Sequence, residues 1–387
     1  MDNFGKYSEE NLAALAKAKE AGKTIAGLYC AFAPHELVMA AGAIPIGLCS
    51  TRLEPIGAAE RVLPTSLCPL IKSSYGAAIT GSCPYFKASD FIIAETTCEG
   101  KKKMFELLGE WKPIILLELP QRTDGTYALE WWVSELRRCQ AWLEERMGVK
   151  VTEEALRDTI RTMNRERRLL QRLYSFYHED KVPLSGVSMH TALLGQVSPV
   201  DHQAYATALE NLISHLEERV ELGLYANTEA QPRILITGCP TGNGSDKVLR
   251  LVEECGGIIV GQESCNGIKT ASILVDEEKE PLVALAERHL SIGCAVRTPN
   301  RARFDLIDRL VVQHKVDGVV DLTWQGCHSY NIESYSLRRH LQERHGIPTL
   351  QVVTDYSESD TEQLRTRIAA LMELLDSRRE SLSPVSL

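Results

Sequence analysis

The feature that most constrains this sequence is the placement of its eleven cysteines, which are spread over a chain of 387 residues. No two of them form the Cys-x-x-Cys pair of a zinc ribbon or a thioredoxin-like motif, and no closely spaced run of the ferredoxin type is present. A chain of this length does not need disulfides to stabilise its core. We therefore expect metal ligands or catalytic thiols drawn from separate loops, the alternative being buried, unreactive thiols.

The charge and hydropathy of the chain exclude several classes of protein. Lys and Arg number 43 and Asp and Glu 52, so the net charge is −9, which argues against a general nucleic-acid binder. No apolar run approaches the roughly 18 residues of a membrane helix, and residues 1–23 predict an amphipathic helix rather than a signal peptide. We expect a cytoplasmic protein without a nucleic-acid or membrane partner, in which the thiols stay reduced.

Apolar runs alternate with helical patterns at both ends of the chain. Strands are predicted at 24–30, 44–49, 90–95 and 113–119, and again at 233–238, 258–264, 317–324 and 348–353. Helices are predicted at 34–42, from about 68, and at 101–111, 246–255, 279–291, 301–315, 331–344 and 359–376. Strands that alternate with helices predict parallel sheets. The expected fold is α/β, with two similar parallel-sheet (Rossmann-like) lobes.

The middle of the chain has helical spacing throughout and no strand-like run between about 125 and 225. We therefore predict an N-terminal α/β lobe at 1–125, a helical connector at 126–228, a C-terminal α/β lobe at 229–378 and a flexible tail at 379–387.

The two lobes carry their cysteines in a repeated order. Cys30 and Cys239 each follow the first strand of a lobe, and Cys98 and Cys327 each follow a strand that begins at an Asp. Cys68 and Cys294 lie 30 and 33 residues before those second partners. The repeat predicts that the lobes are equivalent and arose by duplication.

Ligands of open α/β sheets gather at the carboxyl ends of strands, where Cys30, Cys98, Cys239 and Cys327 are expected. Each is also expected just before a helix N-terminus, whose dipole favours the thiolate. Thiolates are the ligands that soft metals and iron–sulfur clusters require. Two facing lobes would bring both sets of thiols into one cleft.

Several longer passages of the chain carry a resemblance to a known family. The passages LCPLIKSSYG, CPYFKASDFIIAETTCEGKKKMFELL, ESCNG and WQGCHSYNIES, from a match that runs from about residue 24 to 376, resemble the 2-hydroxyacyl-CoA dehydratase superfamily of the D-component type. The similarity is greatest to its double-cubane-cluster branch of anaerobic reductases.

The resemblance implies a set of iron ligands. Cys68, Cys98 and Cys327 correspond to the three cysteines that hold a [4Fe–4S] cluster in dehydratase subunits. A double-cubane [8Fe–9S] cluster needs three more, for which the best set is Cys30, Cys265 and Cys294. Cys239, Cys49 and Cys83 are held in reserve, and Cys139 and Cys255, inside predicted helices, are expected to be structural. Relatives often carry Cys-x-Cys where this chain has Val296, so Cys294 must serve there.

Neighbouring residues suggest supporting roles. Ser73 and Ser74 could hydrogen-bond cluster sulfides or act as an ordinary helix cap. His328 and Glu95 are candidate proton donors to a bound substrate. Lys101, Lys102 and Lys103 are expected to form a solvated helix face rather than a phosphate or partner site.

Two enzyme functions and one binding function follow. The resemblance implies a reductase of small molecules, expected to be a homodimer, that receives low-potential electrons from a separate ATP-hydrolysing iron–sulfur protein. The alternative is a 2-hydroxyacyl-CoA dehydratase component, a radical hydro-lyase with one [4Fe–4S] cluster. The third possibility is a two-lobed binding protein with structural thiols.

Overall fold

The computed structural model describes residues 2–124, 127–228 and 231–382, and it contains two parallel four-stranded sheets. The first has the order β2-β1-β3-β4 and the second the order β6-β5-β7-β8. The strands are β1 (Ile25–Leu28), β2 (Ile44–Gly47), β3 (Phe91–Glu95), β4 (Ile114–Leu117), β5 (Arg233–Gly238), β6 (Ile258–Glu263), β7 (Gly318–Trp324) and β8 (Thr349–Thr354). The shared order confirms the predicted α/β class with two similar lobes.

Helices cover the faces of both sheets. Those of the first lobe are α1 (Asp2–Glu20), α2 (His35–Ala40), α3 (Ile56–Ala59), α4 (Pro69–Ile79), α5 (Pro84–Ala88) and α6 (Glu99–Leu108). Those of the second are α11 (Lys247–Glu254), α12 (Ile268–Ala271), α13 (Pro281–Ser291), α14 (Arg301–Gln313), α15 (His328–His345) and α16 (Thr361–Leu382). Strands β1, β3, β5, β6 and β7 are buried along their whole length, as parallel strands covered on both faces must be.

The segment between the lobes is helical, as its spacing predicted. It contains α7 (Tyr127–Met147), α8 (Glu153–Ser175), α9 (Gly186–Leu194) and α10 (His202–Glu221), with 3₁₀ turns at Phe176–His178 and Gly195–Val197. Side chains cap the N-termini of three of these helices, because Thr152 Oγ1, Ser185 Oγ and Asp201 Oδ1 accept the Ala155, Ser188 and Ala204 amides at 3.1, 3.2 and 3.0 Å.

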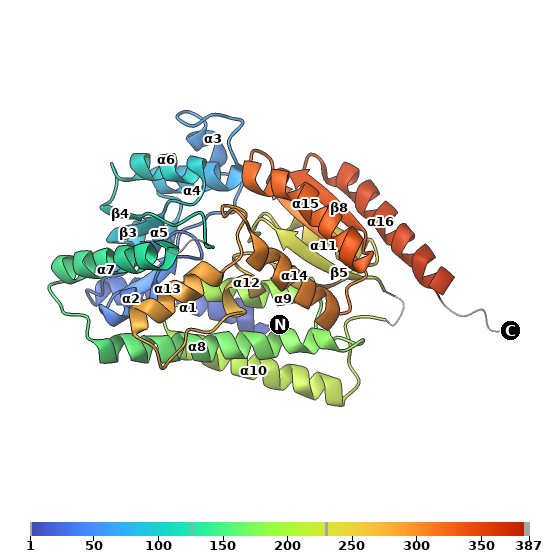
Figure 1. Cartoon of the computed structure of the whole chain (residues 1–387), viewed down its shortest axis with the longest axis horizontal. Coiled ribbons are helices and arrows are strands. Elements are labelled where there is room, and N and C mark those ends of the chain that lie inside the picture. Colours follow the sequence, from blue (N-terminus) through green and yellow to red (C-terminus); the bar gives the residue numbers. More distant parts are fainter. Residues whose placement is uncertain (1, 125–126, 229–230, 383–387) are drawn as a thin grey trace.

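These helices also contact both lobes. Helix α8 packs on α2 and on α12, and α7 packs on β4 and on α13. Figure 1 shows α8 and α10 running side by side along one edge of the molecule. One hydrophobic cluster is shared by the lobes, since it includes Ile92 of β3 and Val320 of β7. The lobes are therefore packed against each other and braced by α7 and α8.

Three sequence expectations differ from the structure. Cys30 and Cys239 do not directly precede helices, because loops 31–34 and 240–246 separate them from α2 and α11. The short helices α3, α5 and α12 were not predicted, since four or five residues are too few to show a period. Helix α16 continues to Leu382 instead of ending near 376, and the rest of the predicted tail, 383–387, lies outside the described residues.

Among the helices of the described part of the chain, none is both long enough and apolar enough to cross a membrane.

Gly326, in the second lobe, lies where the backbones of the two lobes come close together. Its φ is +73°, and an added Cβ would lie 2.5 Å from Ser66 O and 3.0 Å from Cys68 N. Only glycine fits the left-handed conformation without strain, and no side chain fits this contact. The loop that carries Cys68 can therefore lie against the loop that carries Cys327.

We expect Gly326→Ala to destabilise the protein by about 1–3 kcal/mol, because it adds both backbone strain and a clash with main-chain atoms. Thermal unfolding of the protein purified without air measures the loss. Gly57→Ala is the matched control, since no atom lies within 4 Å of its added Cβ. Equal unfolding temperatures for the two variants would contradict this account of the contact.

Candidate metal centre

Each sheet has a switch point, where successive strands are added on opposite sides of the first. From β1 the chain moves out to β2 and returns to β3 on the other side of β1, and the second sheet does the same at β5 and β7. Cys30 and Cys98 follow β1 and β3, and Cys239 and Cys327 follow β5 and β7. Loops at such a point diverge and leave a crevice for a ligand.

One cavity of about 1150 Å³ joins the two crevices. Nine of the eleven cysteines line it: Cys30, Cys49, Cys68, Cys83, Cys98, Cys239, Cys265, Cys294 and Cys327. They come from both lobes. The predicted cleft between the lobes therefore exists, and it is where the thiols meet.

Cys68, Cys239 and Cys327 form a first trio of thiols in contact. Hydrogen bonds from Cys239 and from Cys68 lower the pKa of Cys327 far below its ordinary value. The contact with Cys327 and burial raise the pKa of Cys68, and burial raises that of Cys239. Cys68 belongs to the first lobe and its two partners to the second, so this trio spans the interface.

Cys30, Cys265 and Cys294 form a second trio. A hydrogen bond between Cys30 and Cys265 lowers the pKa of Cys265 and raises that of Cys30. The Cys294 thiol is close enough to act electrostatically on Cys265 and is acted on by Cys30. Cys30 has a φ of +75°, a conformation that costs a residue other than glycine about 1–3 kcal/mol. The fold maintains this strain at Cys30, the residue that places a thiol at the carboxyl end of β1.

Burial raises the pKa of Cys98, and Cys327 of one trio and Cys30 of the other are both close enough to raise it further. Cys98 is the residue just before α6, as Cys68 and Cys327 are just before α4 and α15, so three thiols meet helix N-termini as predicted.

The remaining cysteines have other partners. Cys49 Sγ accepts a hydrogen bond from Lys101 Nζ at 3.7 Å, and Cys83 Sγ accepts from the Phe86 amide at 3.3 Å. Cys139, a residue of α7, is buried in the core, and Cys255, at the end of α11, donates to Arg365 O at 3.8 Å. The last two lie outside the cavity.

Buried cations face the thiols. Lys101 is only 7% exposed. Burial alone would lower its pKa, but the thiols of Cys49, Cys30 and Cys98 raise it well above the ordinary value. The expectation of a solvated lysine face is therefore wrong for Lys101. It holds for Lys102 and Lys103, which pair with Glu99 and Glu106 at 2.9 and 2.7 Å.

In the second lobe the buried cation is Lys269, which lies in a network of buried charged and polar groups. Lys269 Nζ lies 2.8 Å from Glu263 and donates to Tyr330 Oη at 2.8 Å. Arg303 lies 3.1 Å from Glu263 and 4.7 Å above the Tyr330 ring. Residue patterns did not assign the role of a buried cation to Lys101 or Lys269. A usable signal existed, because Lys101 is one helical turn after Cys98 and shares its inward face with Met104 and Leu108.

The chemistry of this donor set fits an iron–sulfur cluster. Soft thiolates drawn from separate loops and balanced by buried cations are what such a cluster needs. Among the described residues, no three His, Cys, Asp or Glu side chains are arranged to hold a single metal ion. Thiols that each bind a different iron do not need that arrangement.

The predicted supporting residues lie in three different settings. Ser73 and Ser74 do not line the cavity: their hydroxyls bind the backbone of Arg52 and Ser50, whose loop does line it. His328 is exposed at the cavity wall. Glu95 is fully buried behind Cys30, both of its carboxyl oxygens lack a hydrogen-bond partner, and burial followed by Cys30 raises its pKa well above the usual range.

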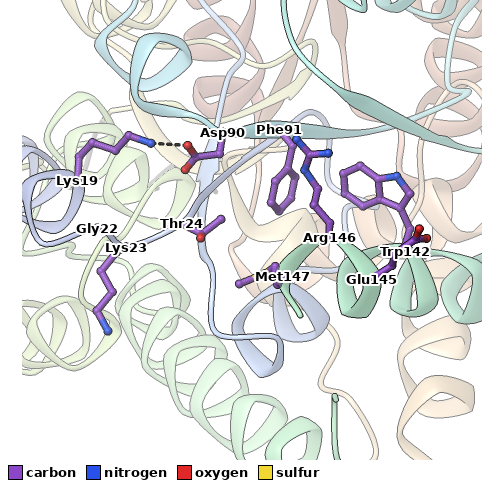
Figure 2. A pocket seen from close by; sticks show the side chains of 10 residues that line it. All are labelled: Lys19, Gly22, Lys23, Thr24, Asp90, Phe91, Trp142, Glu145, Arg146 and Met147. Atoms are coloured by element: carbon purple, nitrogen blue, oxygen red, sulfur yellow. Dashed lines mark hydrogen bonds and ion pairs between the residues drawn. The ribbon is translucent and has the colours of Figure 1, made fainter. Parts of the chain in front are cut away.

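A second pocket, of about 840 Å³, lies at the opposite ends of the strands of the first sheet. Figure 2 shows Lys19 paired with Asp90, and Arg146 beside the rings of Phe91 and Trp142. It contains no cysteine, so it does not compete with the thiol cavity as a metal centre.

The low pKa of Cys327 predicts that its thiol reacts with alkylating reagents at low pH in protein from which iron has been removed. We expect iodoacetamide to label Cys327 at pH 5–6, where an ordinary thiol is protonated and inert. Cys68→Ala removes one donor and should slow this labelling several-fold, as measured by peptide mass spectrometry. Cys255→Ala, outside the cavity, is the control. Labelling of Cys327 only above pH 8 would contradict the assignment.

Comparison with known proteins identifies the family of this chain. Residues 30–375 match the family model described as 2-hydroxyglutaryl-CoA dehydratase, D-component. YjiM of Escherichia coli strain K12, provisionally described as a dehydratase subunit, is 41% identical, covering 97% of each chain. The (R)-phenyllactyl-CoA dehydratase beta subunit of Clostridium sporogenes is 23% identical over 92% of this chain and 93% of its own. A component of the benzoyl-CoA reductase of Thauera aromatica is 21% identical, covering 76% and 71%. This chain belongs to the 2-hydroxyglutaryl-CoA dehydratase D-component family.

Proposed function

We propose that the chain is an anaerobic iron–sulfur reductase that holds a double-cubane [8Fe–9S] cluster between its lobes. One observation carries the proposal: nine thiols line a single cavity, and six of them meet as two trios that each contain thiols from both lobes. A dehydratase subunit with one [4Fe–4S] cluster needs three thiols, and this cavity offers more than twice that number.

The proposed ligands are Cys30, Cys265 and Cys294 for one cubane and Cys68, Cys98 and Cys327 for the other. Cys239 competes with Cys98 for the sixth place. We favour Cys98 because it precedes α6, whose dipole supports a thiolate. Cys239 is 4% exposed and precedes no helix, and its Sγ already accepts the Trp324 amide at 3.4 Å.

When bound, the cluster would supply low-potential electrons to a small unsaturated or nitrogen-containing molecule. Lys101 and Lys269 hold positive charge beside the thiolates, which lowers the free energy of burying so much negative charge. His328, at the cavity wall, would hold a proton at its imidazole for the reduced product, and buried neutral Glu95 holds a second one behind Cys30.

The partners follow from the same proposal. A separate ATP-hydrolysing iron–sulfur protein would deliver the electrons, and two copies of this chain would form a homodimer. Support comes from the relatives, which are named as subunits of dehydratases and of a reductase. The runner-up function is a dehydratase component, favoured by the family name and by those dehydratase subunits.

Iron and sulfide analysis of protein purified without air separates these functions. We expect about eight irons for each chain, against about four for a dehydratase component and none for a binding protein. Cys68→Ser and Cys327→Ser should each remove roughly half of the iron or more, whereas Cys255→Ser should keep it. Full iron content in Cys327→Ser would remove the core of the proposal.

The sixth ligand has its own test. We expect Cys98→Ser to lose iron and Cys239→Ser to retain it, because Cys98, unlike Cys239, lies directly before a helix N-terminus and is close enough to both Cys327 and Cys30 to interact with them electrostatically. The reverse result would transfer the ligand role to Cys239 and leave Cys98 as a neighbour of the cluster.

The proton donor is tested at constant iron content. His328→Gln should lower the reduction rate of a small substrate by roughly a hundredfold or more, the usual contribution of a positioned acid, and leave the iron count unchanged. His215→Gln, on the exposed face of α10, is the control. An unchanged rate in His328→Gln would assign proton transfer to another group.

A further inference from the structure

A group of buried charges lines the cavity on α2, α8 and α13, apart from the thiols. Arg288 of α13 is 6% exposed and Arg167 of α8 is 4% exposed, and both guanidinium groups line the cavity together with Glu36 of α2. The charged groups that act on Arg288 are Arg167 and Glu36, not the cysteines. The group therefore has no role in balancing the charge of the thiolates.

Arg288 is a buried cation without a carboxylate partner. Its Nε donates to Ile273 O at 3.2 Å and its Nη2 to Thr270 O at 2.5 Å. Among the described residues, no carboxylate pairs with it and Nη1 has no protein acceptor. Burial, followed by the neighbouring Arg167, lowers the pKa of Arg288 to about 9, which is the direction expected when a cation lacks a counter-ion.

Nearby groups do not balance this charge. Glu36 pairs with Arg167 Nη2 at 2.5 Å, so its carboxylate already has a guanidinium partner. Glu166, the other carboxylate on this part of the wall, faces His202 Nδ1 at 2.7 Å. His35 stays neutral because burial lowers its pKa to about 4. Of the two guanidinium groups on this wall, Arg288 is therefore the one that has no ion pair of its own among the described residues.

An anchoring role for Arg288 does not account for this arrangement. Two carbonyl acceptors could be met by a neutral amide side chain, whereas a buried cation is stable only with an opposite charge nearby. The missing charge must therefore come from something that enters the cavity. A planar guanidinium with a free Nη1 binds a carboxylate through two parallel hydrogen bonds.

We propose that the substrate reduced in this cavity is a small free carboxylic acid, and that Arg288, with Arg167 beside it, binds its carboxylate. The reaction rests on the function proposed above, whereas the anion site does not depend on the cluster. The carboxylate on this wall would direct the other end of the molecule toward the thiols.

Calorimetric binding of propionate and propionamide to the protein purified without air tests the proposal. The two probes have the same shape and differ in charge. We expect propionate to bind at least tenfold more tightly, and Arg288→Met to weaken propionate by about ten- to a hundredfold while leaving propionamide unchanged. Arg288→Lys keeps the charge and should lose less. Arg309→Met, on the exposed face of α14, should have no effect.

The outcomes separate the two proposals. Equal affinities for propionate and propionamide in the unaltered protein would overturn the anion site, and that comparison needs no variant that could misfold. Coenzyme A is the third probe: if it binds through Arg288 and propionate does not bind, the anion is a phosphate of an acyl-CoA and the free-acid proposal fails. Iron is counted on the same samples, so propionate binding by iron-free protein supports the anion site while contradicting the reductase.

Discussion

The convergence of thiols at two facing switch points determines most of what this molecule can do. A parallel sheet opens a crevice wherever its strand order reverses, and each lobe places two cysteines there, Cys30 with Cys98 and Cys239 with Cys327. Packing the lobes face to face joins the crevices into one cavity. Thiols at this density are unstable in isolation, because burial raises their pKa and crowding opposes further ionisation. Lys101 and Lys269 provide the compensating charge from opposite sides.

The sequence was most informative where periodicity is strong. Short apolar runs bounded by turns identified the eight strands, because that is the pattern of buried parallel strands. The same order of strands, helices and cysteines at both ends of the chain identified the repeat. The segment 126–228 was recognised as helical from its spacing, although its packing on both lobes could not be read from a pattern along one chain. The repeat paired Cys30 with Cys239 and Cys98 with Cys327, and those cysteines do follow equivalent strands.

The repeat missed one further equivalence. Cys49 follows β2 as Cys265 follows β6, yet the flanking residues share too little similarity to align. The contacts among thiols were also beyond the sequence. The contact of Cys239 with Cys327 depends on the approach of loops far apart along the chain, and the inward turn of Lys101 depends on which face of α6 is covered. Tertiary packing determines both the thiol contact and the orientation of Lys101, and neither can be predicted from local sequence propensity.

The two lobes share a topology but not a charge distribution, and the difference gives the cavity a direction. After Cys98 the inward position one turn later is Lys101, and after Cys327 the equivalent position is Tyr330, which reaches its cation only through Lys269. Cys49 meets Lys101, whereas its counterpart Cys265 meets Cys30. A duplicated fold therefore surrounds a cavity whose halves are chemically unequal. In the function proposed above, this inequality would let one wall hold an inorganic centre, while Arg288, on a wall formed partly by the inserted helix α8, would bind a molecule that enters from outside.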